Sequence, residues 1–212
     1  MSFDLAKSGV SVLSDALDRL GISGQAEGVH AIGPATALCG PAFTVRMVPA
    51  EVRPRSVGDY IDDVQPGSIV VIDNAGRTDT TVWGGLLTFT AHARGIGGTV
   101  VHGVCRDSEE LQTVPYPLFA RAAHMRTGKD RVQAEEYNVP VSLGAARVAA
   151  GDWVVGDRDG VVVIPAADVG RVLEATRQIE TAEVAIRAAV AAGKRLDEAR
   201  REFGYHALQS RT

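Results

Sequence analysis

The sequence predicts an α/β fold with layered sheets, in which strands from both ends of the chain join one core. Three segments support this prediction: a strand, a helix and a strand in succession over residues 68–104, a strand–turn–strand segment over residues 151–165, and a long amphipathic helix over residues 167–193. Two strands joined by a helix normally form a right-handed unit with parallel strands. This order of elements favours a layered α/β protein over an open nucleotide-binding sheet.

The N-terminal part is expected to begin with a helix over residues 11–20. Apolar residues recur there at helical spacing, and Gly21 follows as a stop signal. A glycine-rich connection over residues 24–40 leads to the segment AFTVRMVPA, which alternates enough to suit a strand. Tyr60–Asp63 is expected to form a short helix before a proline–glycine turn.

The central unit carries the clearest periodic signals. Ser68–Ile72 is a nearly continuous β-branched run, which is typical of a strand buried on both faces. Trp83–Arg94 follows with helical spacing, and Thr99–Val104 predicts the second buried strand. Because the two strands are expected to be parallel, the start of the helix and the end of the second strand lie at the same edge of the sheet.

The C-terminal half predicts two more strands, at residues 118–122 and 139–143, and then a hairpin that turns at Asp159-Gly160. The long helix and a short helix near residues 196–203 close the chain. The glycine pattern after the first buried strand is not the dinucleotide fingerprint, and neither a P-loop nor a GxSxG motif is present.

The composition of the 212 residues is that of an ordinary globular protein, with 45% hydrophobic and 23% charged residues. The net charge of −4 argues against nucleic acid and against acidic membranes as partners. No apolar run approaches the roughly 20 residues that cross a bilayer, and the N-terminus does not resemble a signal peptide. Cys39 and Cys105 fit no metal spacing and favour a reduced compartment, with a disulfide as the alternative. We expect a cytoplasmic protein.

Gly84 and Gly85 stand at the start of the crossover helix. Glycines at this place let a ligand approach the backbone closely, and the unpaired amides of a helix start can hold a carboxylate. The alternative interpretation is a tight turn with a close helix contact.

Arg106 and Asp107 directly follow the second buried strand, and ligands of α/β sheets prefer the carboxyl ends of strands. Arg106 offers a planar fork for a carboxylate or an enolate oxygen, and Asp107 is an oxygen ligand suited to Mg²⁺. The structural alternative is that Asp107 caps the helix that starts at Ser108, while Arg106 pairs with Glu109 or Glu110. Because both motifs lie at the same edge of one unit, we expect them to face one cleft.

Other polar residues are weaker candidates. His92 and His102 are expected to be satisfied core or edge residues rather than catalytic groups. Asp73-Asn74 follows a strand and either lines the same cleft or stabilises a turn. Trp83 is interpreted as a packing anchor.

The run PGSIVVIDNAGRTDTTVWGGLLTFTAHARGIGGTVVHGVCRDSEEL resembles the RraA-like family. The similarity extends from about Gly40 to Pro165. Its most specific feature is the G-x-x-R-D pattern that ends in Arg106-Asp107. The segment GDWVVGDRDGVVVIP is similar to the family's closing hairpin. The family includes aldolases for 4-hydroxy-4-methyl-2-oxoglutarate and 4-carboxy-4-hydroxy-2-oxoadipate, which also decarboxylate oxaloacetate, and a regulator that inhibits an RNA-degrading enzyme.

The resemblance implies a single domain over residues 1–212 with a compact α/β/β/α fold. It divides the chain into an N-terminal helical segment (1–39), an α/β core (40–165) and C-terminal helices (166–212). It also implies a homo-oligomer, a trimer or a hexamer, with its sites at subunit interfaces. In that arrangement Asp107 ligates Mg²⁺ or Mn²⁺, Arg106 contacts the keto oxygen, and the amides of Leu86 and Leu87 hold the substrate carboxylate.

One position departs from the aldolase pattern. The aldolases carry an aspartate 21 residues before the motif arginine, and that position is Gly85 in this chain. A proton relay through that carboxylate is therefore absent here. Aldolase members also use a glutamate from a neighbouring subunit's C-terminal helix, for which Glu180 or Glu183 is a candidate.

The preferred hypothesis is metal-dependent C–C bond cleavage next to a small α-keto acid, either retro-aldol cleavage or oxaloacetate decarboxylation. In it, the metal and Arg106 stabilise the enolate that forms as the bond breaks. A retro-aldol reaction also needs a base, whereas decarboxylation does not. The alternatives are a non-catalytic protein-binding regulator of RNA degradation, and a lyase in which Gly84-Gly85 makes room for a bulkier acid.

Overall fold

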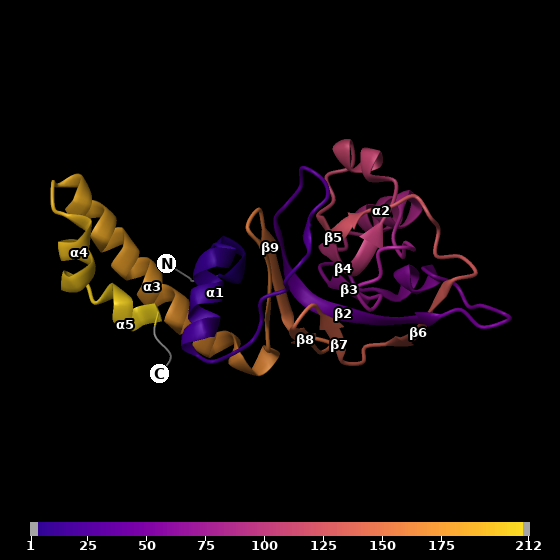
Figure 1. Ribbon diagram of the computed structural model, residues 1–212, viewed down its shortest axis with the longest axis horizontal. Helices are drawn as coiled ribbons and strands as arrows, with labels where there is room; N and C mark the ends of the chain where they lie inside the picture. Colours follow the sequence, from indigo (N-terminus) through magenta and orange to yellow (C-terminus); the bar gives the residue numbers. More distant parts are fainter. Residues whose placement is uncertain (1–3, 210–212) are drawn as a thin grey trace.

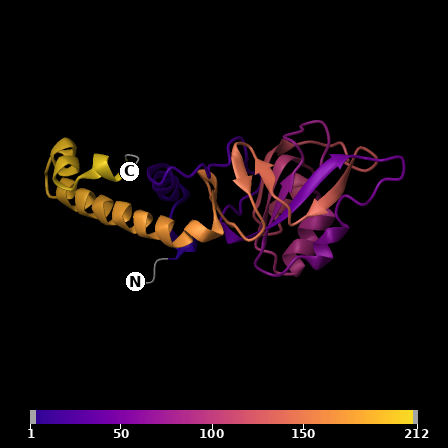
Figure 2. The same ribbon diagram turned by 90° about the horizontal axis from the view of Figure 1, so that it is seen from below.

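The computed structural model describes residues 4–209 of the chain. Figure 1 shows an α/β body at one end of the molecule and a group of C-terminal helices that extends away from it. The view in Figure 2, turned by 90°, shows the same separation. We call α3 (Val169–Ala191), α4 (Leu196–Glu202) and α5 (Tyr205–Gln209) the helical arm.

The α/β body contains ten strands and the crossover helix. The strands are β1 (His30–Ala31), β2 (Leu38–Pro49), β3 (Ile69–Asp73), β4 (Gly98–Cys105), β5 (Leu118–Ala123), β6 (Val132–Tyr137), β7 (Val141–Leu143), β8 (Ala146–Val148), β9 (Trp153–Asp157) and β10 (Gly160–Ile164). The α-helices outside the arm are α1 (Val10–Arg19) and α2 (Gly85–Ala93), and the 3₁₀ helices are η1 (Leu5–Lys7), η2 (Asp59–Asp63), η3 (Ser108–Gln112) and η4 (Ala166–Asp168).

Eight of the strands form one strongly curved sheet in the order β1-β5-β4-β3-β2-β9-β10, with β6 also paired to β2, while β7 and β8 form a separate hairpin. Strand β2 joins the two halves of the chain. Its first residues, Leu38–Pro41, pair with β9 near the C-terminal end, and its middle, Ala42–Arg46, pairs in parallel with β3. The prediction that strands from both ends share one core is therefore confirmed.

The predicted strand–helix–strand unit is also confirmed. Strands β3 and β4 are parallel, with Ile69 opposite Gly98 and Asp73 opposite His102, and α2 connects them. Alternate residues of β3 face opposite sides, as the pleat of a strand requires. Val70 and Ile72 pack in the cluster beneath α2, whereas Ile69 and Val71 pack in a second cluster between the two halves of the sheet.

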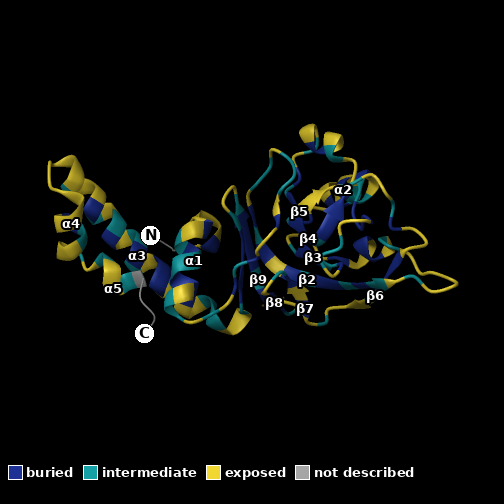
Figure 3. Ribbon diagram, in the orientation of Figure 1, coloured by how far each residue is buried: buried dark blue, intermediate teal, exposed yellow. Residues whose placement is uncertain are grey.

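The same alternation in β10 builds the remaining layers. Val161 and Val163 point into the cluster between the sheet halves, while Val162 and Ile164 point outward to α1 and α3. The layers are then α2, the β2–β5 half, the β9–β10 half, and α1 with α3, which is the α/β/β/α arrangement that the family resemblance implied. Figure 3 shows the strands of this core as the most buried part of the molecule.

Several elements differ from the sequence predictions in detail. Strands β1, β6 and β8 and helix α5 were not predicted, and the short helix expected at Ser108 is the 3₁₀ turn η3. Strand β6 has the sequence VQAEEY, of which Val132, Gln133 and Ala134 are buried while Glu136 and Tyr137 are exposed. Its conformation depends on pairing with β2, whereas the β-branched alternation that predicts a strand is missing from its sequence.

The helical arm is anchored to the α/β body through the base of α3, and one face of α3 is exposed. Val172, Ala175 and Ile179 of α3 pack against α1 and the outer face of the β9–β10 hairpin. Farther along the same helix, Val184 is 67% exposed. No helix within residues 4–209 is both long enough and apolar enough to span a bilayer.

Candidate functional site

The start of α2 and the end of β4 meet at one edge of the parallel sheet. The Arg106 N–H donates to the Trp83 carbonyl over 2.9 Å, and the Val82 N–H donates to the Val104 carbonyl over 3.3 Å. These backbone bonds hold the segment before α2 alongside the end of β4. The two glycines at the start of α2 and the Arg106-Asp107 pair are therefore neighbours.

Asp107 bridges the two motifs. Its Oδ2 atom accepts a hydrogen bond of 2.9 Å from the Gly85 N–H and lies 3.4 Å from Nε of Arg106. Asp107 is in the left-handed conformation, with φ of 58°, a conformation that aspartate adopts more readily than most residues. The predicted proximity of the glycine pair and the Arg106-Asp107 pair is observed.

Neither structural alternative for this pair occurs. Asp107 makes no side-chain capping bond to the helix that follows it, and the amide that it binds belongs to α2 instead. Within residues 4–209, the ion pair of Arg106 is with Asp107, and none links it to Glu109 or Glu110. The carboxylate thus caps α2 across space, an arrangement that helix-capping patterns along the sequence do not reveal.

Side chains from the segment after β4 fill the space beside Gly84 and Gly85. A Cβ atom at Gly84 would lie 2.8 Å from Oδ2 of Asp107 and 3.1 Å from Cγ of Arg106. A Cβ atom at Gly85 would lie 2.3 Å from Oε2 of Glu110. The φ of Gly84 is −155°, which is extended backbone open to any residue. The protein's own side chains therefore approach the backbone closely here, and the predicted approach of a ligand stays a prediction.

The first turn of α2 leaves amides available for an anion. The Gly85 N–H is bound by Asp107, and the Thr88 N–H donates to the Gly84 carbonyl over 3.0 Å. The amides of Leu86 and Leu87 lie between them, where a helix offers no internal carbonyl partner. The helix dipole adds a partial positive charge at the same place. These two amides are suited to a carboxylate.

A cavity of about 840 Å³ opens in front of these groups. It is lined by Pro54–Asp59, Ile61–Asp62, Thr81–Leu87, Thr90, Arg106–Asp107 and Thr127–Asp130. The segments before η2 and after β5 were not predicted to belong to the site. They are loops without periodicity or a recognised motif, so only their position in the fold identifies them as walls.

Comparison with known proteins agrees with this geometry. The RraA-like family, described as Aldolase/RraA, matches residues 10–163. The chain belongs to the RraA-like family. It is 38% identical over 196 residues to protein DlpA of Legionella pneumophila. That alignment covers 91% of this chain and 32% of DlpA, so the chain spans about a third of the length of that relative. It is 31% identical over 170 residues to the "Putative 4-hydroxy-4-methyl-2-oxoglutarate aldolase" of Halalkalibacterium halodurans, covering 78% of this chain and 77% of that protein.

Two solved structures share the RraA-like fold. An uncharacterized protein from Pseudomonas syringae pv. tomato superposes with a TM-score of 0.85 at 38% identity, covering 93% of this chain and 96% of that chain. Streptomyces coelicolor RraAS2, described as an unusual member of the RNase ES inhibitor RraA family, superposes with a TM-score of 0.75 at 25% identity and covers 84% and 91% of the two chains.

The oxygen ligands of this RraA-like site suit Mg²⁺ better than a metal whose ligands must all be protein side chains. No group of three or more histidine, cysteine, aspartate or glutamate side chains that could hold a metal occurs in residues 4–209. Oδ2 of Asp107 is engaged, and its other oxygen has no hydrogen bond within that part of the chain. Mg²⁺ is commonly held by one or two carboxylates and keeps several waters. A single carboxylate at an open cavity fits that requirement.

The other polar candidates serve the RraA-like fold. Asp73 accepts hydrogen bonds from the Ala75 N–H and the Ser142 N–H, and its Oδ1 lies 3.2 Å from Nδ1 of His102. Asp73 thus stabilises a turn and does not line the cavity, and His102 is satisfied by Asp73. Trp83 is buried and donates to Thr88 over 2.9 Å, as expected of a packing anchor.

The thiol nearest to the site is not available for chemistry. Cys105 is a free, buried thiol directly before Arg106, and burial raises its pKa to about 11. The protonated form therefore dominates near neutral pH, so a nucleophilic role is disfavoured. Cys39 is also a free thiol, and the disulfide alternative is therefore wrong.

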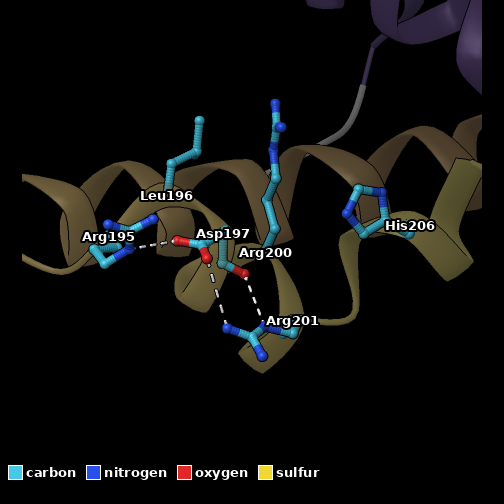
Figure 4. A pocket seen from close by; sticks show the side chains of 6 residues that line it. All are labelled: Arg195, Leu196, Asp197, Arg200, Arg201 and His206. Carbon is cyan, nitrogen blue, oxygen red and sulfur yellow. Dashed lines mark hydrogen bonds and ion pairs between the residues drawn. The ribbon is translucent and has the colours of Figure 1, made fainter.

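A second pocket lies on the helical arm, far from α2 (Figures 1 and 4). It is lined by Arg195, Leu196, Asp197, Arg200, Arg201 and His206. Asp197 accepts a bond of 3.0 Å from Nε of Arg195 and also pairs with Arg201 at 3.7 Å. On the same arm, Glu183 pairs with Arg187 and accepts a bond from the Tyr205 hydroxyl. These ion pairs join residues of the arm to one another, and the three arginines of the pocket face a single aspartate.

Proposed function

We propose that this protein is a divalent-metal-dependent lyase that cleaves a C–C bond next to the carbonyl of a small α-keto acid. The observation that carries the proposal is the convergence of Arg106, Asp107 and the first amides of α2 on one cavity. A carboxylate, a guanidinium and a set of free amides are complementary to an α-keto acid and to a cation that binds it. The aldolase name of the Halalkalibacterium halodurans relative supports the same reaction class.

The amides of Leu86 and Leu87 would bind the substrate carboxylate, because a helix N-terminus combines free N–H donors with a favourable dipole. The space beside Gly84 is taken by the Asp107 carboxylate and the Arg106 side chain, so both groups lie close to these amides. With the carboxylate bound there, the keto group faces the end of β4. The amides therefore fix which end of the substrate enters the cavity.

Arg106 would stabilise the enolate oxygen that forms when the C–C bond breaks. Its side chain is 43% exposed and lines the cavity, and its Nε lies 3.4 Å from the carboxylate of Asp107. Donors that are already in place contribute most where charge develops in the transition state. Asp107 would hold Mg²⁺ or Mn²⁺, which supplies Lewis-acid polarisation of the keto oxygen when it is bound.

The test is metal-dependent release of pyruvate from oxaloacetate and from 4-hydroxy-4-methyl-2-oxoglutarate, followed with a coupled pyruvate assay. We expect turnover with Mg²⁺ or Mn²⁺, its loss with EDTA, and its recovery when the metal is restored. Release no faster than the metal-catalysed background on both substrates would reject the proposal. The oligomeric state, which we propose to be a trimer or hexamer, can be measured on the same sample by light scattering.

A second candidate function is protein binding in the regulation of RNA degradation. The observation that favours it is the similarity to Streptomyces coelicolor RraAS2, which belongs to an RNase ES inhibitor family. The metal-dependent assay separates the two functions. A lyase releases pyruvate and needs Arg106 and Asp107 to do so, whereas a purely protein-binding regulator releases none. A protein without turnover that inhibits an RNase E-type enzyme would support the second candidate.

A further inference from the structure

One wall of the cavity is a segment without helix or strand, residues 51–58, which lies between β2 and η2. We call it the wall segment. Residues 51–56 are all exposed, and residues 54–58 line the cavity. An exposed segment without secondary structure is held in place by the few hydrogen bonds and contacts that it makes with the rest of the fold. Those bonds therefore decide where this side of the cavity stands.

A fully buried glutamine on β6 fastens the wall segment. Oε1 of Gln133 accepts a hydrogen bond of 3.1 Å from the Glu51 N–H and one of 3.3 Å from the Arg55 N–H. Its strand neighbours Val132 and Ala134 pack in the core cluster beneath α2, so Gln133 points to the opposite face of the strand. The Gln133 side chain is 0% exposed. A buried amide with bonded partners restrains the segment that it binds.

The same side chain also reaches the charged end of Arg55. Nε2 of Gln133 donates to Oε2 of Glu135 over 3.0 Å, and that oxygen lies 3.7 Å from Nη1 of Arg55. Gln133 therefore holds the backbone of Arg55 directly and its guanidinium through Glu135. The Arg55 side chain is 59% exposed and lines the cavity. A guanidinium in a long and exposed ion pair can still donate to a ligand.

The wall segment touches the start of α2, where the substrate carboxylate would bind. A Cβ atom at Gly58 would lie 2.8 Å from Cδ2 of Leu87, so the Leu87 side chain packs directly on the backbone of the wall segment. A substrate held by the Leu87 amide therefore lies beside this segment. The rest of that substrate extends into the cavity that Arg55 lines.

We propose that Gln133 is a positioning residue: it fixes Arg55 so that the guanidinium contacts the part of the substrate beyond the bond that breaks. This role rests on the proposed lyase function. In a 4-hydroxy-2-oxo acid, that part carries oxygen-bearing substituents on C4, which accept hydrogen bonds from a guanidinium. Oxaloacetate lacks any carbon beyond C4. Gln133 and Arg55 therefore contribute to binding of the longer acid and little to binding of the shorter one.

A purely structural role for Gln133 makes different predictions. In that case, loss of its hydrogen bonds would lower the melting temperature and change the kinetics of both substrates alike. A positioning role that acts through Arg55 raises KM for the longer acid and leaves kcat nearly unchanged, because it removes binding that the ground state and the transition state share.

The first experiment compares Gln133→Met with the matched control Gln25→Met. Gln25 is hydrogen-bonded to Ser14 and Asp18 of α1, in the layer opposite to α2. For Gln133→Met we expect KM for 4-hydroxy-4-methyl-2-oxoglutarate to rise about tenfold, with its kcat and both oxaloacetate constants within about threefold of wild type. Gln25→Met should leave all four constants near wild type. Equal changes for both substrates, or an unchanged KM for the hydroxy acid, would overturn the inference.

The second experiment tests whether Gln133 acts through Arg55. Arg55→Met changes an exposed side chain, so folding is not at risk, and it should raise the same KM about tenfold. Adding Gln133→Met to Arg55→Met should raise KM little further, because residues that act together have non-additive effects. Additive changes, or an unchanged KM in Arg55→Met, would contradict the proposed route. If Gln133→Met does not fold, Glu135→Gln takes its place in the cycle, because Glu135 links the two residues.

Hydrogen exchange tests the fastening of the wall segment without any substrate. We expect peptide 51–58 to exchange about tenfold faster in Gln133→Met than in wild type, because two of its amides lose their acceptor. Gln25→Met should leave the exchange of this peptide unchanged. An unchanged exchange rate in Gln133→Met would contradict the position assigned to its side chain.

Failure of this inference is distinguishable from failure of the proposed function. A wild-type protein that releases no pyruvate from either substrate rejects the lyase itself, and with it the role of Gln133. A wild-type protein that turns over both substrates, together with an unchanged KM in Gln133→Met, keeps the lyase and rejects only the positioning role.

Discussion

The cleft at the start of α2 and the helical arm both carry many charged side chains, but they arrange them differently. In the cleft, the Gly85 amide, Arg106 and Asp107 come from two segments about 20 residues apart and converge on one carboxylate oxygen. On α3 the ion pairs are local, such as Arg177 with Glu174 and Arg187 with Glu183, three or four residues apart on one helix.

This difference indicates which charges carry function. Pairs at helical spacing follow from helix periodicity alone, and exposed pairs of this kind contribute little to stability. A convergent set needs the fold to bring it together, and it leaves donors and acceptors facing a cavity. Substitutions in the two regions should therefore separate activity from stability.

The largest expected effect is on catalysis. Arg106→Lys should lower kcat for pyruvate release about 100-fold or more, because a point charge cannot replace the planar fork at a developing enolate. The matched control is Arg187→Lys on α3, where the guanidinium is 79% exposed and pairs with Glu183. Steady-state kinetics on both variants make the comparison, and near wild-type turnover in Arg106→Lys would remove the proposed role.

The second expected effect separates the buried face of α3 from its exposed face. Ile179→Ala should lower the free energy of unfolding by about 2–5 kcal/mol, because it leaves a cavity between α3, α1 and the outer face of the sheet. Val184→Ala, at a position that is 67% exposed, should change it by no more than about 0.5 kcal/mol. Urea unfolding of the two variants measures both values, and equal losses would mean that the outer part of the arm is covered in solution.

The smallest expected effect concerns pH. The guanidinium of Arg177 and the amide of Gln178 lower the pKa of Glu174 from 4.5 to about 2. A carboxyl group whose pKa is lowered by folding stabilises the folded state at pH values above its pKa in the unfolded chain. That stabilisation is lost as the pH falls through the folded-state pKa of about 2. Because the carboxylate is exposed and screened, wild type and Glu174→Gln should differ in melting temperature by no more than about 1 °C at neutral pH. Melting curves in which the stabilisation of wild type over Glu174→Gln grows below pH 4 would contradict the predicted direction of this pH dependence.

The sequence by itself determined the elements whose signals are local and periodic. The β-branched run of β3, the crossover helix, β4 and the Asp159-Gly160 turn all follow from patterns within about 15 residues. The sequence also predicted that Gly84-Gly85 and Arg106-Asp107 lie close together. Parallel strands joined by a helix place the start of that helix and the end of the next strand at one edge of the sheet.

Only the tertiary structure decided what those residues contact. The hydrogen bond from Gly85 to Asp107, the carboxylate of Glu110 over Gly85, and the cavity walls at 54–59 and 127–130 depend on side-chain directions and loop positions. Strand β6 likewise exists because β2 pairs with it. These features arise from contacts between segments far apart in the chain or from the exact turn after Asp107, and neither leaves a periodic pattern in the sequence.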